Sequence, residues 1–219
     1  MSLQPAEESA PTNTRPTSPD GAWRRITATI ASLLLAVGLA GCASDDLANQ
    51  YRAGSGKGYI SGDGTITELP PTDRGDPIKF TGTTESGDTV DAADYVGQVV
   101  IVNFWYAGCA PCRAEAPDLE AVHQKYADED VAFLGVNVRD QADTARAFAQ
   151  TYGVTYPSIM DVPEAAAALA FAGDFAPNAV PTTLVLDRDG RVAGRILGQL
   201  SSRATLSALV DAVLGEPTE

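Results

Sequence analysis

The stretch that decides the fold reads Asn103-Phe-Trp-Tyr-Ala-Gly-Cys109-Ala-Pro-Cys112-Arg-Ala-Glu-Ala-Pro117. Its two cysteines follow the apolar run Val99–Phe104 and stand at the start of a helix-like segment. The N-terminus of a helix presents unpaired backbone N–H groups and a partial positive charge, and both stabilise a thiolate. The thiolate is the form of cysteine that attacks disulfides. The pattern therefore predicts a redox-active dithiol.

Other uses of a C-x-x-C pair fit this sequence less well. A structural zinc site needs four ligands, and outside the pair only Cys42 and His123 could supply them. A c-type haem needs a histidine directly after the second cysteine, where Arg113 stands instead. A purely structural disulfide would close too small a loop to stabilise the fold much. We therefore expect no metal and no cofactor.

The third cysteine, Cys42, ends a segment with the features of an export signal. Trp23-Arg24-Arg25 precedes a short apolar run at 30–39, and the small residues Ala40-Gly41 follow. These features are typical of a secretory signal, and the run is too short for a typical transmembrane helix. Leu39-Ala-Gly-Cys42 resembles a bacterial lipobox, which implies removal of residues 1–41 and lipid on Cys42. An ordinary signal peptide and an uncleaved anchor are the alternatives, and all three place the remaining chain outside the cytoplasm.

The rest of the chain divides into a tether and one domain. Residues 42–75 are poor in large apolar residues and rich in glycine, which is typical of a flexible membrane tether. Residues 76–219 are enough for a single globular domain. The net charge of −14 argues against nucleic acid and against an anionic membrane surface as partners. We expect a monomer held at the membrane by the lipid on Cys42.

Hydrophobic patterns in the domain alternate between strands and helices. We expect strands at 80–83, 89–90, 99–104, 131–138, 157–160, 182–186 and 192–197, with hairpins formed by the first two and by the last two. We expect helices at 109–126, 143–152, 163–171 and 201–214, the last capped by Ser201 or Ser202. This order predicts an α/β fold in which a central mixed sheet carries helices on both faces.

Four motifs together carry a family resemblance: Val102-Asn-Phe-Trp105, the dithiol segment Cys109–Pro117, Gly135-Val-Asn137 and Val180–Gly190. With them the chain resembles the TlpA/ResA/DsbE-like family of extracytoplasmic thioredoxin-fold proteins, over residues 76–215. The resemblance implies a thioredoxin-like three-layer fold, in which a central mixed β-sheet is flanked by helices and preceded by an N-terminal β-hairpin.

The resemblance also implies where a substrate binds. Pro181 would form a cis peptide bond that faces the dithiol. It and Val180 would leave backbone groups free to hold a substrate segment in extended pairing, with Trp105 as a further substrate contact. An ordinary proline at a strand start is the alternative for Pro181. Gly108 departs from the family, which usually has tryptophan there, so we expect a more open surface beside Cys109.

A carboxylate is expected to assist the second thiol. The thioredoxins proper have an aspartate at the position of Asn103, and an amide cannot titrate. Glu115 matches the acidic position of the extracytoplasmic group and would lie on the same side of the helix as Cys112. We expect Glu115 to exchange a proton with Cys112. The alternative is an acid that only stabilises the helix dipole. We expect His123 to face solvent and to have no role.

These residues predict a thiol–disulfide oxidoreductase. Cys109, nearer the helix start and expected to be the more exposed cysteine, would attack a substrate disulfide, and Cys112 would resolve the mixed disulfide. Ala110-Pro111 adds no charge and no hydrogen-bonding side chain, which favours a reductant or a mildly oxidising exchanger. We expect it to reduce disulfides of exported proteins. The resemblance implies apocytochrome c as a substrate. The membrane tether fits a membrane-embedded electron donor, or an acceptor if the direction is reversed. The acidic charge fits either such a donor or a basic partner protein.

Four alternatives stay open. They are a disulfide-forming oxidase for exported proteins, a peroxiredoxin-like peroxidase, a copper chaperone and a non-catalytic binding lipoprotein. A peroxidase would need a threonine or serine shortly before its cysteine, and Trp105–Gly108 supplies none. A copper chaperone would need a distal histidine or methionine beside the cysteines.

Overall fold

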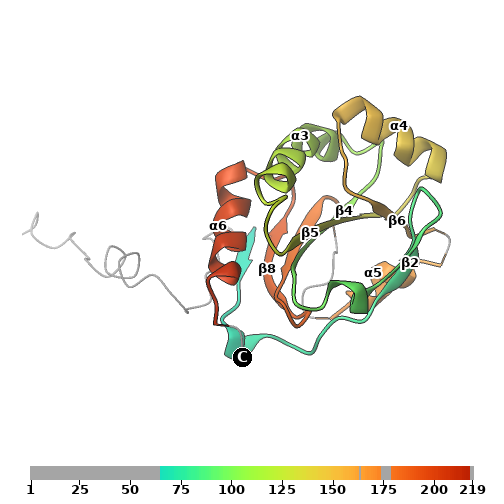
Figure 1. Cartoon of the computed structure of the whole chain (residues 1–219). Coiled ribbons are helices and arrows are strands. Elements are labelled where there is room, and N and C mark those ends of the chain that lie inside the picture. Colours follow the sequence, from blue (N-terminus) through green and yellow to red (C-terminus); the bar gives the residue numbers. More distant parts are fainter. Residues whose placement is uncertain (1–64, 163, 174–178, 218–219) are drawn as a thin grey trace, which may run out of the picture. The chain divides into compact units, whose positions relative to one another are not determined.

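A computed structural model of the chain describes residues 65–162, 164–173 and 179–217 (Figure 1). The predicted signal peptide, the predicted lipidation site Cys42 and most of the predicted tether lie outside these residues. Within the described part of the chain, no helix is both long and apolar enough to cross a membrane. In chain order the elements are β1 (Ile66–Glu68), η2 (Pro71–Asp73), β2 (Thr81–Thr83), β3 (Thr89–Asp91), η3 (Ala92–Tyr95), β4 (Val99–Trp105), α3 (Ala110–Lys125), β5 (Val131–Asn137), α4 (Ala142–Tyr152), β6 (Ser158–Met160), α5 (Ala166–Ala170), β7 (Thr182–Leu186), β8 (Val192–Leu197) and α6 (Arg203–Leu214).

A six-stranded mixed sheet in the order β1-β8-β7-β4-β5-β6 forms the middle layer. β4, β5 and β6 run parallel, whereas β7 is antiparallel to β4 and β8, and β1 is antiparallel to β8. Every residue of the central strand β4 is buried. A strand covered on both faces needs apolar side chains on both, which is why its sequence is nearly all apolar.

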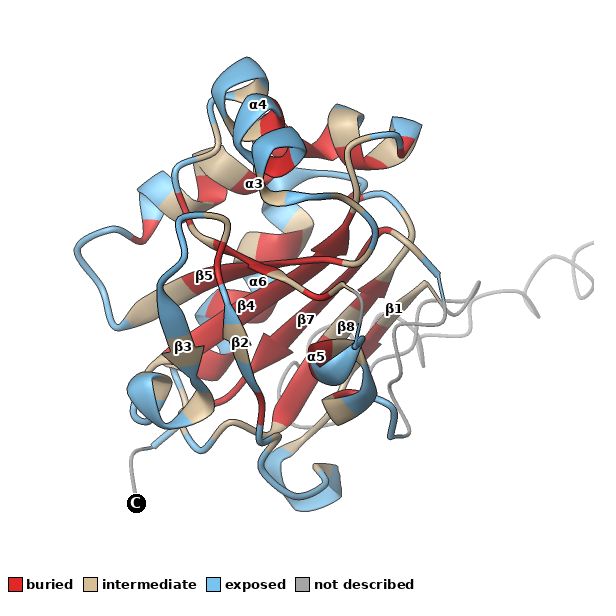
Figure 2. Ribbon diagram, turned by 90° about the vertical axis from the view of Figure 1, so that its right-hand side faces the viewer, coloured by how far each residue is buried: buried red, intermediate tan, exposed pale blue. Residues whose placement is uncertain are grey.

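Two apolar clusters hold the layers together. On one face α3 and α6 pack on the sheet through residues such as Leu119 and Leu206. On the other face lie the β2–β3 hairpin and α5, with Phe80 and Phe171 in the second cluster. Figure 2 shows the buried residues concentrated in the sheet between these two coverings. The three-layer α/β fold with an N-terminal hairpin is therefore confirmed.

Helix ends follow local chemistry. Gly153 ends α4 with φ 72°, a left-handed conformation that glycine adopts readily. The Ser202 hydroxyl accepts a hydrogen bond from the Thr205 N–H and caps α6, as predicted. The predicted helix at 163–171 is shorter and covers only Ala166–Ala170. It cannot extend backward because Ala165 has φ 53°, in the left-handed region.

The predicted boundary between tether and domain at 75/76 is wrong, because residues 65–75 belong to the folded domain. β1 adds to the sheet by pairing with β8. The Arg74 side chain is 2 % exposed and forms an ion pair with Asp187 at 2.9 Å and another with Glu216. Three distant parts of the chain therefore meet at one guanidinium: the segment before the hairpin, the β7–β8 turn and the end of α6.

We predict that Arg74→Ala destabilises the domain by about 2 kcal/mol or more, because Glu216 loses this cation and the buried Asp187 carboxylate keeps only the partly exposed Arg191. Unfolding in urea, followed by circular dichroism, measures the change. Arg203→Ala is the matched control, since Arg203 pairs with Asp118 at the surface with 64 % of its side chain exposed. The control should lose less than about 1 kcal/mol. Equal losses in the two variants would contradict a structural role for the buried cluster.

Candidate active site

The dithiol lies where β4 gives way to α3. Cys109 is the N-cap of α3, and Ala110-Pro111 form its first turn. Cys109 and Cys112 are joined in a disulfide. The Cys112 N–H points at the Cys109 sulfur, with the nitrogen 3.1 Å from Sγ. The predicted placement at a helix start is thus confirmed, and after reduction the same N–H is in position to stabilise a Cys109 thiolate.

Exposure does not distinguish the two cysteines, contrary to expectation. Cys109 is 3 % exposed and Cys112 2 %. The exposed neighbours of Cys109 are Gly108 and Ala110. What separates the sulfurs is their position on α3, because only Cys109 receives the N–H of the first turn.

The Val180–Pro181 peptide bond is cis, as the resemblance implied. β7 is antiparallel to β4 with Thr182 opposite Phe104, so the residues before β7 reach the end of β4 that leads to the dithiol. The Val180 carbonyl oxygen lies 4.0 Å from the Cys109 sulfur. A disulfide sulfur has no proton to donate, so in this state that oxygen remains available to another donor.

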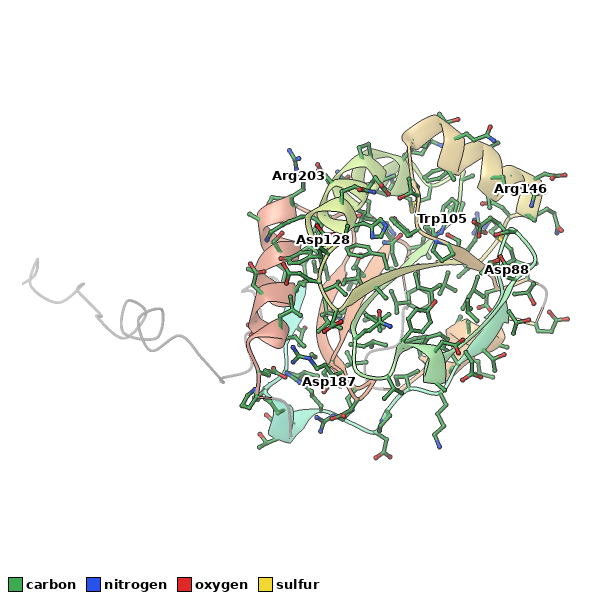
Figure 3. All side chains as sticks on the ribbon, in the orientation of Figure 1. Asp88, Trp105, Asp128, Arg146, Asp187 and Arg203 are labelled. Atoms are coloured by element: carbon green, nitrogen blue, oxygen red, sulfur yellow. A yellow bond between two sulfur atoms is a disulfide. The ribbon has the colours of Figure 1, made fainter. Side chains whose placement is uncertain are left out.

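Trp105 does not face a substrate, and that prediction is wrong. Its side chain is 5 % exposed, and Figure 3 shows it inside the domain. The indole N–H donates to the Ser158 hydroxyl at 3.2 Å, and the ring packs on Phe148 with centroids 4.3 Å apart. A residue at the end of a strand buried on both faces has its side chain in the core. Trp105 belongs to the same buried apolar cluster as Cys109 and Cys112 and therefore supports the dithiol from inside the domain.

Glu115 is a buried carboxylate one turn beyond Cys112 on α3. It is 1 % exposed. One oxygen accepts from the Asn103 amide at 3.0 Å and the other from the Leu200 N–H at 2.7 Å. Burial raises the pKa of Glu115 to about 7, although these two donors pull it back. A group with this pKa can gain or lose a proton at neutral pH.

The Asn103 amide also donates to the Thr183 hydroxyl at 3.0 Å. The amide therefore ties β4 to β7 while it holds Glu115. The sequence showed that Asn103 cannot titrate. It did not show that Asn103 orients Glu115, which can. Leu200, the second donor, carries no sequence signal because its contribution is a backbone N–H.

Asn137 and Asp140 form a hydrogen-bond network with the loop before Cys109, which was not predicted. The Asp140 carboxylate accepts from the Ala107 N–H at 2.6 Å and from the Asn137 amide at 2.9 Å. The Asn137 side-chain oxygen accepts in turn from the Asp140 N–H at 2.7 Å. This network fixes the loop that delivers Cys109. An asparagine that ends an apolar strand and has an aspartate three residues later was the available signal.

The surface beside Cys109 is shaped by Tyr106. Gly108 is exposed, and a Cβ added there would lie 3.3 Å from the Tyr106 ring. The Arg139 guanidinium lies over that ring at 4.0 Å from its centroid. An aromatic residue therefore does lie beside the dithiol, two positions before the glycine that replaces the family's tryptophan.

His123 is half-buried and packs against Phe133 and Tyr156, so the prediction that it faces solvent is wrong. Among the described residues, no group of three or more histidine, cysteine, aspartate or glutamate side chains is placed to bind a metal ion.

A disulfide at a helix start, a facing cis-proline and a buried carboxylate below the second cysteine define a thiol–disulfide oxidoreductase with a thioredoxin fold. The chain belongs to the AhpC/TSA family, whose model matches residues 75–195, more than half of the chain.

Named relatives agree with this class. The chain is 32 % identical to the thioredoxin-like protein YneN of Bacillus subtilis over 127 residues, 57 % of this chain and 71 % of YneN. It is 26 % identical to the thiol-disulfide oxidoreductase ResA of Bacillus thuringiensis, over 55 % of this chain and 66 % of ResA. Among solved structures, it is similar to a secreted thiol-disulfide isomerase from Corynebacterium glutamicum. That match has a TM-score of 0.60 and 33 % identity, and covers 72 % of this chain and 99 % of the isomerase.

We predict that the Cys109 thiol in reduced Cys112→Ser protein has a pKa below the ordinary value of about 8.5. The N–H of residue 112 and the start of α3 stabilise the thiolate, and serine keeps both. The rate of alkylation by iodoacetamide, measured by mass spectrometry across pH 5–10, gives the value. In Cys109→Ser protein, Cys112 should alkylate only at higher pH. Faster alkylation of Cys112 at neutral pH would reverse the assignment of the two cysteines.

Proposed function

We propose that this protein is a membrane-anchored, extracytoplasmic thiol–disulfide oxidoreductase that reduces disulfides in exported proteins. The observation that carries the proposal is that the two cysteines of the dithiol lie in different environments. Cys109 has an N–H donor at the start of α3, and Cys112 lies one turn before a buried carboxyl group whose pKa is raised by burial to about 7. The first environment suits a nucleophile, and the second suits a thiol that must lose its proton on demand.

The reaction has two steps. The Cys109 thiolate attacks a substrate disulfide, which forms a mixed disulfide and releases one substrate thiol. Cys112 then loses its proton to Glu115 and attacks the Cys109 sulfur, which releases the second substrate thiol and leaves the Cys109–Cys112 disulfide. The Val180 carbonyl, 4.0 Å from the Cys109 sulfur, is available to accept a backbone N–H from a substrate segment beside Pro181.

We predict that Glu115→Gln slows the second step by about 10²-fold at pH 8, because it removes the proton acceptor. Wild-type protein should react faster as the pH rises through about 7, where the carboxylate becomes ionised, and the variant should lack this rise. Glutamine fits the site if the Asn103 amide rotates by about 180°, so that its oxygen replaces its nitrogen. That oxygen can then accept hydrogen bonds from the new glutamine amide and from the Thr183 hydroxyl.

Stopped-flow reaction of the reduced protein with a small aromatic disulfide measures this step. Glu120→Gln is the matched control, because Glu120 also lies on α3 but bonds to Thr155 instead of the site. If Glu115→Gln and the control react alike between pH 5 and 8, Glu115 is only a structural acid.

The proposed direction rests on the modest stabilisation of the Cys109 thiolate. Within the described chain its sulfur receives one N–H, and Ala110-Pro111 contribute no further donor side chain. The Arg113 side chain is directed to the Ala107 carbonyl. A strong oxidant needs a strongly stabilised thiolate. The ionised form of Glu115 would disfavour a nearby thiolate further.

We predict a reduction potential near −250 mV for the Cys109–Cys112 pair, on a scale where thioredoxin lies at about −270 mV and strong oxidants at about −120 mV. Equilibration with glutathione redox buffers, read by mass spectrometry of alkylated protein, gives the value. A result near −130 mV would replace the reductant with a disulfide-forming oxidase and leave the dithiol chemistry unchanged.

Location and partners complete the proposal. The lipobox-like Leu39-Ala-Gly-Cys42 supports lipid attachment at Cys42, and two or more acyl chains would anchor the protein stably. A reductant there would act on exported proteins, with apocytochrome c as one candidate, and would receive electrons from a membrane-embedded donor. Mass spectrometry of the native N-terminus tests the anchor, and an intact Gly41–Cys42 bond would contradict it.

A further inference from the structure

A small cavity lies against Cys112, between α3, α4 and the strands β4 and β6. Its volume is about 10 Å³, which is about the room that one water molecule needs. Apolar side chains of α3 and α4 form part of its wall. The polar residues that line it are Glu85, Asn103, Tyr156 and Ser158.

Two of these residues have unused hydrogen-bonding capacity. The Ser158 hydroxyl accepts from Trp105, but its own proton has no acceptor among the described residues. The Tyr156 hydroxyl has no hydrogen bond to any residue in the described ranges, although the tyrosine is only 7 % exposed. A buried water typically makes two to four hydrogen bonds to such groups. Size and lining therefore both suit one ordered water next to Cys112.

Glu85 lines this cavity and is also partly exposed to solvent. It lies in the turn between β2 and β3 and is half-buried. One carboxylate oxygen accepts from the Ser158 N–H at 2.8 Å, and the other has no partner among the described residues. The Glu85 N–H donates to the Ser158 carbonyl at 3.1 Å, and Arg146 donates to the Glu85 carbonyl. Figure 3 shows Arg146 on α4 beside the hairpin end that carries Asp88. These hydrogen bonds therefore fix both the backbone and one carboxylate oxygen of a residue that lines the cavity.

The buried pair of Cys112 and Glu115 needs such an outlet. In the reduced protein Cys112 holds a proton, and in the disulfide form above pH 7 Glu115 is mostly ionised. Each oxidation of the dithiol at that pH therefore releases at least the Cys112 proton from inside the domain, and each reduction takes it up. Asn103, which contacts Glu115, is an amide and cannot carry it. Tyr156 links the two places: it lines the cavity, and the charge of Glu115 raises the pKa of its hydroxyl beyond the effect of burial.

We propose that one water molecule in this cavity, together with the Glu85 carboxylate, carries the proton between the Cys112–Glu115 pair and solvent. The proposal rests on the proposed role of Glu115 as proton acceptor. No electron moves in this step: a proton leaves the buried pair, passes through the water to Glu85 and is released to bulk water. Glu85 acts through the water and is a positioning residue, not a catalytic one.

Other charged groups near Glu85 are few. From α4, Arg146 contacts its backbone and is paired with Asp143. Asp88 lies on the same hairpin. From α3 the titratable group that lines the cavity is Cys112, and from the segment before β6 it is Tyr156. Glu115 does not line the cavity and lies one turn beyond Cys112 on α3. Glu85 is thus the one carboxylate that lines the cavity within the described chain.

The test uses Glu85→Gln in the otherwise unchanged protein. Glutamine keeps an oxygen for the Ser158 N–H but cannot carry a proton. Reduced protein is mixed with dithiobis-nitrobenzoate, whose coloured thiol is released once by Cys109 attack and once by Cys112 resolution. A relay contributes less than the 10²-fold of a direct base, so we expect the second release to slow about tenfold above pH 7 with the first unchanged. Added formate, a small proton carrier, should restore the second rate.

Glu120→Gln is the matched control, because Glu120 likewise accepts from a backbone N–H, that of Thr155, but does not line the cavity. Tyr156→Phe should slow the second release more weakly, and it supplies a second variant if Glu85→Gln folds poorly. A second release in Glu85→Gln equal to that of Glu120→Gln, or a slowing that is independent of pH and unaffected by formate, overturns the relay. Glu115→Gln separates the two ideas: if it is slow while Glu85→Gln is normal, only the relay fails. If both are normal, the role of Glu115 fails as well.

Discussion

The site depends on a carboxyl group that the fold removes from water without giving it a cation. Glu115 is held by two neutral donors, and it has no ion pair within the described chain. Burying an ionised carboxylate in this way is unfavourable, so the pKa rises to about 7. Below that pH the group stays neutral and the cost is small. Near and above it, the protein carries a buried base one turn from Cys112.

The fold supplies this environment from four elements. β4 contributes Asn103, β7 contributes Thr183, α3 contributes Glu115 itself, and the segment before α6 contributes the Leu200 N–H. The same α3 presents Cys109 at its first turn, so one helix provides both an N-terminus that stabilises a thiolate and a carboxylate that deprotonates the second thiol. The antiparallel pairing of β7 with β4 then puts the Val180–Pro181 bond opposite the disulfide. Each cysteine acquires its role from its place on this frame.

Much of this could be predicted because its causes are local. The all-apolar run at 99–104 predicts a strand buried on both faces, the β7–β8 hairpin follows from two strand-like runs around a turn, and the dithiol and Glu115 are a few residues apart on one helix. What failed depends on distant partners. β1 is a three-residue strand that forms because β8 offers an edge, and Arg74 is buried because Asp187 and Glu216 come to it. Trp105 points into the core because its indole N–H bonds to Ser158 and its ring packs on Phe148. The Leu200 N–H could not be predicted, because a backbone donor does not depend on the type of side chain.

The central claim is that burial, and not a neighbouring charge, makes Glu115 a base at neutral pH in the disulfide form. Carbon-13 NMR of the glutamate side-chain carboxyls, with the Glu115→Gln protein to assign the signal, measures this directly. We expect one buried glutamate signal whose chemical shift titrates with a pKa of about 7. A midpoint at the ordinary value of about 4.5 would contradict the account, because Glu115 would then be ionised throughout the working range and could not respond to the state of Cys112.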